Sequence, residues 1–135
     1  MKTPEEIVNL MMKEDSFSQW LGVVIDKIDF GICHLRASIN SEMLNGFHIA
    51  HGGISYSLAD SALAFASNSH GLQCVSIETS ISHVKKISEG DLIIAEAKEI
   101  HRGKNTGIYN VTLINQHSQI VALFKGTVFV TDKEW

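Results

Sequence analysis

A long apolar segment in the middle of the chain, residues 53–70, constrains the fold more than any other part of the sequence. It carries large apolar residues at helical spacing, its other positions are mostly alanine and serine, and Gly71 follows as a candidate C-cap. Eighteen residues give a helix of roughly 27 Å. Because nearly every side of this helix is apolar or small, we expect it to be buried on most of its circumference, as a helix wrapped by a sheet is.

The segments on either side of this helix are of β type. Residues 23–25 and 32–39 predict a hairpin that turns at Gly31, and two short helices are expected before it. Those helices span residues 4–13, with Thr3 as N-cap, and residues 16–21. Four more strands follow the central helix, over residues 73–84, 91–101, 107–115 and 120–131. The polar breaks between them are short, so we predict one antiparallel meander in which successive strands are neighbours.

The first of these four strands shows a strict alternation of residue types. Val75 and Ile77 fall on one predicted face and Ser76 and Glu78 on the other. This is the pattern of a half-buried strand, with Ser76 on the polar face.

Length and composition limit the classes of protein. The length of 135 residues predicts a single domain over residues 1–135, and the order of strands, helix and strands makes it an α+β domain. The formal net charge of −4 gives no general attraction to nucleic acid or to an anionic membrane. Charged residues make up 19%, against roughly 25% in average domains, which favours self-association. Cys33 and Cys74 stand in apolar stretches without metal or redox spacing, so we expect packed, reduced thiols and a soluble, cytoplasmic, unexported protein.

Asp60 is the one carboxylate of the central helix. No lysine or arginine occurs between residues 37 and 84 to pair with it locally. Two interpretations stay open from the residues alone: Asp60 is a functional carboxylate, or it lies on a solvent-facing stripe with Ser57, Ser61 and Ser67. A functional carboxylate in these apolar surroundings would have its pKa raised by burial.

The loop before the central helix has the layout of an oxyanion site. Asn45 supplies an amide, His51 an imidazole, and Gly52 and Gly53 let a carbonyl oxygen approach the helix start closely. Backbone N–H groups at such a helix start are unpaired and lie at the positive end of the helix dipole. The plainer alternative is an ordinary glycine pair at a helix start, with His51 as a packing residue.

Several motifs make the chain resemble the hot-dog-fold acyl-CoA thioesterases, and among them the PaaI-like, phenylacetate-degradation type. They are MLNG (43–46), HGG (51–53), SLAD (57–60), FASNS (65–69), GKNTGIY (103–109) and VALFKG (121–126). The resemblance implies a hot-dog fold, in which an antiparallel sheet wraps around a long central α-helix. It also implies hydrolysis of acyl-CoA, with aromatic acyl groups of the phenylacetyl type. A single sheet cannot cover both sides of the apolar helix and also its own edges, so we expect a homodimer that assembles into a homotetramer.

The same resemblance implies a role for each site residue. Asp60 is the catalytic carboxylate, activating water or attacking the thioester itself, and water activation is favoured. The N–H of Gly52 binds the thioester carbonyl, Asn45 orients water or carbonyl, and His51 positions the loop. Ser76 assists the carboxylate. Asp60 of one protomer would work with the loop of its partner, so the site would be composite.

Coenzyme A needs cations for its phosphates and an open approach to the glycine loop. The candidates are Gly53 in the loop and the basic residues near strand ends, Lys85, Lys86, Arg102 and Lys104. Their alternative is an ordinary solvated rim.

Two other functions remain open at this stage. A hot-dog hydroxyacyl hydratase or dehydratase would use His51 with Asp60, and a non-catalytic acyl-CoA-binding module would need no Asp60. We expect no cofactor and no metal: His48 and His51 form H-x-x-H across a loop without nearby Cys or Glu partners, which is a poor zinc site.

Overall fold

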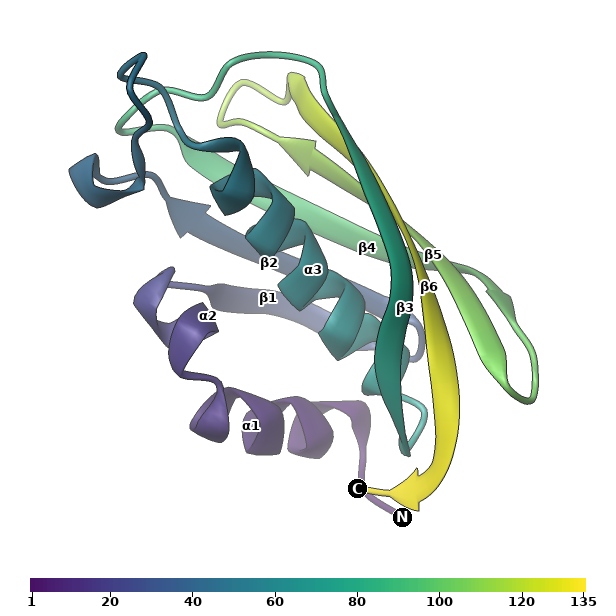
Figure 1. Cartoon of the computed structure of the whole chain (residues 1–135). Helices are drawn as coiled ribbons and strands as arrows, with labels where there is room; N and C mark the ends of the chain where they lie inside the picture. The colour runs from purple at the N-terminus through teal and green to yellow at the C-terminus, as the bar shows by residue number, and fades with distance from the viewer.

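The computed structural model describes residues 1–135, and its core is one long helix held in the concave face of a six-stranded antiparallel sheet (Figure 1). The helices are α1 (Pro4–Glu14), α2 (Ser16–Trp20) and α3 (Gly52–Asn68), with a 3-10 turn at Ser41–Met43. The strands are β1 (Val24–Asp29), β2 (Ile32–Ser38), β3 (Leu72–His83), β4 (Leu92–Arg102), β5 (Thr106–Ile114) and β6 (Ile120–Glu134). The expected sheet around a central helix is confirmed. None of the helices combines the length and the apolar composition that a membrane-spanning helix requires.

Capping residues and glycines mark the ends of the helices and the turn of the first hairpin, as the sequence predicts. Thr3 caps α1 through a capping box with Glu6, as its position before Pro4 predicted. The hairpin of β1 and β2 turns at Gly31, whose φ of 71° requires glycine. Helix α3 ends at Asn68, two residues earlier than predicted, and Gly71 follows with a φ of 106°.

One face of α3 stays open while the rest is buried against the sheet. The buried apolar residues, all in the hydrophobic core, are Ile54, Leu58, Ala59, Ala62, Leu63, Phe65 and Ala66. Ser57, Asp60, Ser61 and Ala64 form a half-buried stripe along the helix. The helix is therefore buried on most of its circumference, as predicted, and Asp60 lies on its open stripe.

The order of the strands differs from the predicted simple meander. Strands β4, β5 and β6 are sequential neighbours, but β3 pairs with β6 and not with β4. The eight residues between β3 and β4, 84–91, do not form a hairpin turn. They cross the end of the sheet instead, where Ile87 accepts from Ala50 and Ile39 donates to Asp91 (Figure 1). This crossing puts β4 beside β2 and leaves β3 as an edge strand.

A β-bulge in β3 overturns the predicted alternation. Val75 pairs with Phe129, which is 43% exposed, and Ser76 pairs with the buried Val128. Paired residues of antiparallel strands point to the same face. Ser76 therefore faces the side of α3, and the register shift after it leaves Ile77 unpaired and exposed. The prediction placed Ser76 on the opposite face, because strict alternation takes no account of an inserted residue.

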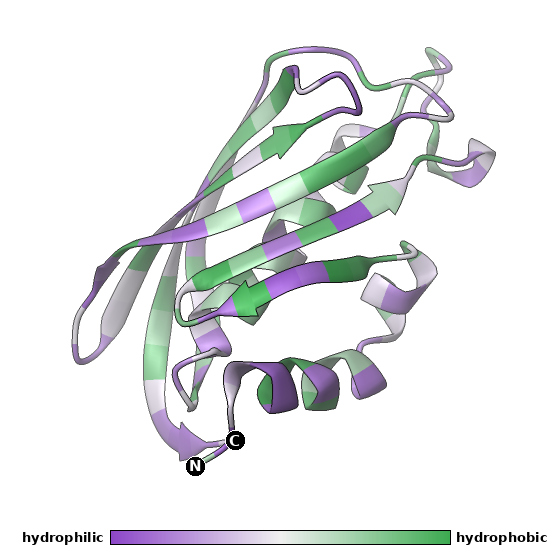
Figure 2. Cartoon of the chain, turned by 180° about the vertical axis from the view of Figure 1, so that it is seen from behind, coloured by the Kyte–Doolittle hydropathy of each residue, from purple (hydrophilic) through white to green (hydrophobic).

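The outer face of the sheet is mixed in character. Seen from behind, hydrophilic and hydrophobic residues interleave along the strands (Figure 2). This is typical of antiparallel sheets with one face on the core. The large apolar residues that β6 exposes are Ile120, Leu123 and Phe129.

Candidate active site

The start of α3 presents one backbone donor without a partner. The ring of His51 caps the helix: its Nδ1 accepts from the N–H of Gly53 at 2.8 Å. The carbonyl of His51 accepts from Ile54 at 2.9 Å. The N–H of Gly52 makes no hydrogen bond within the chain, so of the two predicted glycines only Gly52 offers an open N–H at the positive end of the helix dipole. His51 thus organises the loop, and its Nδ1 is occupied.

Asn45 is tied into the preceding loop by its oxygen. The Oδ1 atom accepts from the backbone of Phe47 at 2.9 Å and of Ile49 at 3.4 Å, as in an Asx turn. The side-chain NH₂ group of Asn45 makes no hydrogen bond. It is therefore the part of Asn45 that is free to donate to a bound molecule.

A surface pocket of about 340 Å³ lies beside this helix start. Its lining includes Asn45 and Gly52 from the loop, Lys85 and Lys86 from the crossing segment, and Ser55 and His83. The Nδ1 of His83 lies 3.3 Å from the Oγ of Ser55. The structure thus brings two predicted loop residues together with two predicted lysines.

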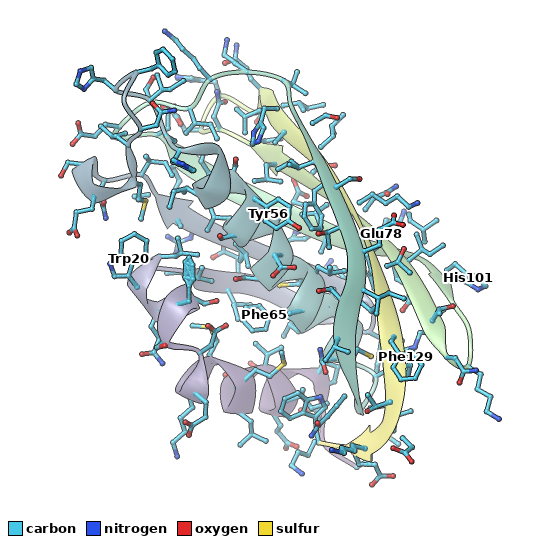
Figure 3. All side chains as sticks on the ribbon, in the orientation of Figure 1. Trp20, Tyr56, Phe65, Glu78, His101 and Phe129 are labelled. Carbon is cyan, nitrogen blue, oxygen red and sulfur yellow. The ribbon has the colours of Figure 1, made fainter.

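Sequence reasoning missed Ser55 and His83. His83 is the last residue of β3 and contacts Ser55 in the first turn of α3. The two residues meet because β3 runs beside α3, where Tyr56 of the helix lies toward the strand (Figure 3). No local pattern marks His83. The Nε2 atom of its ring lies 3.2 Å from the position that a Cβ would take on residue 52. Because Gly52 has no Cβ, the ring can lie close to the open N–H.

Asp60 lies outside this pocket, further along the same helix. It stands eight positions after Gly52, or about 12 Å further along the axis. Its carboxylate is half-buried and makes no hydrogen bond or ion pair. Burial raises the pKa of this carboxyl group, and the negative charge of Asp15 raises it further. The direction agrees with the shift expected from the sequence.

Comparison with known proteins decides the family. The model of the thioesterase superfamily matches residues 47–122, more than half of the chain. The chain belongs to the thioesterase superfamily. Over 116 residues it is 38% identical to the acyl-coenzyme A thioesterase PaaI of Escherichia coli K12, covering 86% of this chain and 83% of that protein. A putative esterase of Archaeoglobus fulgidus is 37% identical over 131 residues, 97% of this chain and 85% of the esterase.

Solved structures agree with this assignment. The structure of E. coli PaaI, from the phenylacetic acid degradation operon, superposes with a TM-score of 0.95 at 34% identity, covering 97% of this chain and 95% of that one. A hypothetical thioesterase of Streptococcus pneumoniae, solved with coenzyme A, has a TM-score of 0.81 at 26% identity, covering 84% and 88%. The resemblance to hot-dog, PaaI-like thioesterases is thereby confirmed, and with it the expectation of an enzyme.

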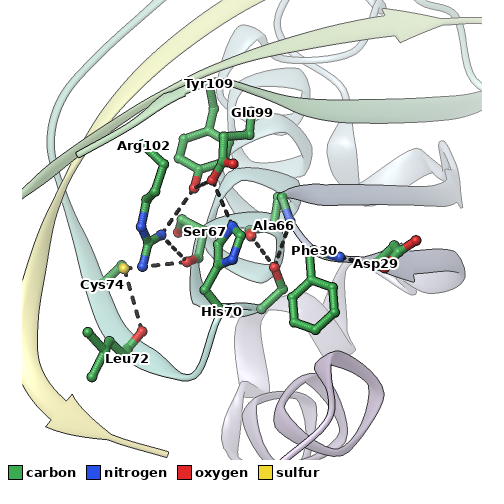
Figure 4. Close-up of polar contacts among 12 residues, drawn as sticks. Asp29, Phe30, Ala66, Ser67, His70, Leu72, Cys74, Glu99, Arg102 and Tyr109 are labelled. Carbon is green, nitrogen blue, oxygen red and sulfur yellow. Dashed lines mark hydrogen bonds and ion pairs between the residues drawn. The ribbon is translucent and has the colours of Figure 1, made fainter. Parts of the chain in front are cut away.

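Arg102 of this thioesterase has a position that the sequence did not suggest. Its Nη1 donates to the carbonyl of Ser67 at 2.9 Å and to the hydroxyl of Tyr109 at 3.2 Å (Figure 4). Tyr109 donates to Glu99 at 2.6 Å, and His70 lies 2.9 Å from the same carboxylate oxygen. The guanidinium therefore holds the C-terminal end of α3, and Arg102 is not among the residues that line the Gly52 pocket.

Lys104 also lies apart from the pocket. It is exposed in the turn between β4 and β5, next to Arg102 and away from the start of α3 (Figure 1). Of the four basic residues named from the sequence, the structure places only Lys85 and Lys86 beside Gly52.

Arg102→Met is expected to lower the free energy of unfolding of the thioesterase by about 1–3 kcal/mol, since it removes the donor to Ser67 and Tyr109. Lys104→Met, an exposed neighbour, should change it by less than about 0.5 kcal/mol. Urea titration followed by circular dichroism measures both. Equal stability of the two variants would show that the Arg102 contacts contribute nothing.

Proposed function

We propose that this thioesterase hydrolyses acyl-CoA to the free acid and coenzyme A, with Asp60 activating water and the N–H of Gly52 binding the developing oxyanion. The observation that carries the proposal is that α3 presents two groups that thioester hydrolysis needs, an unpartnered half-buried carboxylate and an open backbone N–H at the helix start. The E. coli relative is named an acyl-coenzyme A thioesterase, and the Streptococcus relative was solved with coenzyme A. Both support an acyl-CoA substrate.

The chemistry follows from these groups. Asp60 takes a proton from water as the water oxygen attacks the thioester carbon, and its raised pKa makes it a stronger base than an ordinary carboxylate. Negative charge then develops on the carbonyl oxygen, where one preformed N–H donor is worth about 10²–10³-fold in rate. When the intermediate collapses, the thiolate of coenzyme A leaves and the proton on Asp60 can follow it. Water is the nucleophile and coenzyme A is part of the substrate, so no cofactor or metal is required.

One subunit does not complete this site. A thioester bound to the N–H of Gly52 would lie about 12 Å along the helix from Asp60 of the same chain, beyond the reach of one water. A second copy would close the gap if its Gly52 loop met Asp60. Strand β3, whose outer edge no element covers, offers twelve residues for pairing with the same strand of a partner. We therefore propose a homodimer with composite sites that assembles further into a homotetramer.

Ser76 fits the same proposal. The bulge turns it toward the side of α3, where it could steady the carboxylate or its water. The Streptococcus thioesterase has been solved with an aspartate replaced by alanine and with a threonine sixteen positions later replaced by alanine. Asp60 and Ser76 stand sixteen positions apart in this chain. Lys85 and Lys86, beside the Gly52 pocket, are the cations proposed for the phosphates of coenzyme A.

Sedimentation velocity is expected to show a dimer or tetramer at micromolar concentration, with no monomer boundary. The uncovered edge of β3 and the exposed Val75 and Ile77 beside it are the physical reason. A monomer that retains full activity at that concentration would overturn the composite site.

The acyl group is proposed to be aromatic, of the phenylacetyl type, from the likeness to E. coli PaaI. A panel of aryl- and alkyl-CoA thioesters, assayed by release of free thiol, gives kcat/KM for each. We expect phenylacetyl-CoA and its ring-hydroxylated form to lead. A preference for alkyl chains would correct the substrate class, and no thiol release from any thioester would favour a binding module.

The hydratase alternative is less well supported. It needs the ring of His51 as a catalytic group paired with Asp60, but Nδ1 of that ring accepts from the N–H of Gly53 and so serves as the helix cap. Following the absorbance of an enoyl-CoA in the same assays separates the two reactions.

A further inference from the structure

A short chain of hydrogen bonds joins the N-terminal helices to the turn of α3 that carries Asp60. Asp15 stands between α1 and α2, and its Oδ1 accepts from the N–H of Ser18 at 2.9 Å. Its Oδ2 lies 2.6 Å from the Oγ of Ser18, which lies 2.8 Å from the Oγ of Ser61. An ionised carboxylate only accepts, so Ser18 donates to Asp15, and Ser61 donates to Ser18.

These contacts are shielded from water at their centre. Ser18 is 1% exposed, and its hydroxyl is the only link between Asp15 and Ser61. Ser61 directly follows Asp60 in the open stripe of α3. A hydrogen-bond chain that begins on a carboxylate and passes through a buried hydroxyl restricts how this turn can move.

We propose that Asp15 is a positioning residue for hydrolysis, which through Ser18 and Ser61 orients the turn of α3 bearing Asp60 and sets a second negative charge toward that carboxylate. The inference rests on the proposed role of Asp60 as the base. It assigns the junction of α1 and α2 to the active site.

The surroundings of Asp60 leave Asp15 as the charge that acts on it. On α1, Lys13 and Glu14 are exposed, and on β3, Glu78 pairs with Thr127 and faces away from α3. The remaining ionisable neighbour on α3 one turn away is Tyr56, whose hydroxyl is hydrogen-bonded to Thr79 of β3.

The charged groups of β1 are paired or exposed. The carboxylate of Asp26 is neutralised by the guanidinium of Arg36 from β2, 3.0 Å away, and Lys27 and Asp29 are exposed. Burial and Asp15 both raise the pKa of Asp60, and no cation is in place to lower it.

The test compares Asp15→Asn with Asp29→Asn. Each change removes one negative charge and keeps a side-chain oxygen that can accept a backbone N–H, from Ser18 in one case and from Phe30 in the other. The readout is the pH dependence of kcat/KM for thiol release. Loss of the like charge lowers the pKa of Asp60, so the acidic limb of the Asp15→Asn profile should move to lower pH. The limb of Asp29→Asn, and that of Asp15→Glu, should stay with the parent enzyme.

Ser18→Ala tests the positioning part without removing a charge. It breaks the chain between Asp15 and Ser61, and kcat is expected to fall on the order of tenfold with KM little changed, since the base is less well placed. Ser16→Ala, an exposed serine of the same helix, should have no effect.

The outcomes separate this inference from the proposed function. The inference fails, and the proposed function survives, if Asp60→Asn is inactive but the other variants behave like their controls. In that case the acidic limb of Asp15→Asn coincides with that of Asp29→Asn, and the kcat of Ser18→Ala equals that of Ser16→Ala. Asp15 is then only a helix cap. If Asp15→Glu moves the limb as Asp15→Asn does, charge is not the cause, and the inference is overturned. If Asp60→Asn keeps its activity, the proposed function fails as well.

Discussion

Asp60→Asn is expected to lower kcat/KM for acyl-CoA hydrolysis by about 10²–10⁴-fold, because it keeps the shape of the side chain and deletes the base. The carboxylate makes no hydrogen bond that an amide would forfeit, so the fold should be retained. Thiol release under matched conditions measures the loss, with Asp29→Asn as the charge control. Activity within about twofold of the parent enzyme would remove Asp60 from the mechanism.

The same substitution should make the protein more stable at neutral pH. The pKa of Asp60 is raised in the folded state, so the folded protein binds that proton more tightly than the unfolded chain does. Ionised Asp60 therefore destabilises the fold above its folded pKa, and this penalty disappears as pH falls below the unfolded pKa. The Tm of Asp60→Asn should exceed that of the parent at neutral pH, and the difference should shrink in acid. A lower Tm at neutral pH would contradict the direction of the shift.

Mixing two inactive variants should restore activity if each site draws on both chains. Asn45→Asp is the first variant: it keeps the oxygen that accepts from Phe47 and Ile49 and loses the free NH₂ group. Asp60→Asn is the second. In a heterodimer with composite sites, one site carries both changes and the other carries neither. Random exchange makes about half of the dimers mixed, so about one quarter of all sites should recover.

The controls make the outcome decisive. Each variant alone must be folded and deeply impaired, as expected when an interaction made chiefly in the transition state is lost. The double variant Asn45→Asp with Asp60→Asn must also be inactive, which excludes activity from sites that carry both changes. If exchange of subunits is verified and thiol release stays at the level of the separate variants, the residues act within one chain and the composite site is rejected.

Much of the fold could be predicted because its signals are local. The apolar period of residues 53–70, the cap at Thr3 and the turn at Gly31 each depend on residues close together in the chain, and each is confirmed. Asp60, without a local cation, could be singled out in the same way. Its half-buried position without a partner agrees with that choice, and its role remains a prediction.

What only the tertiary structure decided depends on contacts between distant residues. The eight residues after β3 could have formed a hairpin, and it is their contacts with Ala50 and Ile39 that carry the chain across the sheet and leave β3 at its edge. The bulge at Ile77 reverses the face of Ser76 through pairing with β6. No short-range pattern contains that information.

The site, like the fold, has features that residue type predicts and features that only the structure reveals. The motif around Gly52 and the carboxylate of Asp60 could be located from residue types alone. The cap that His51 places on Gly53, which leaves Gly52 open, is a contact between residues two positions apart, but no residue pattern announced it. Packing between elements far apart in sequence brings Arg102 to the end of α3 and brings His83 and Asp15 to the same helix. Sequence by itself determined which residues are candidates for the chemistry, because residue type and spacing limit what chemistry is possible. Only the tertiary structure decided which of their atoms remain free, because hydrogen-bond partners come from the whole fold.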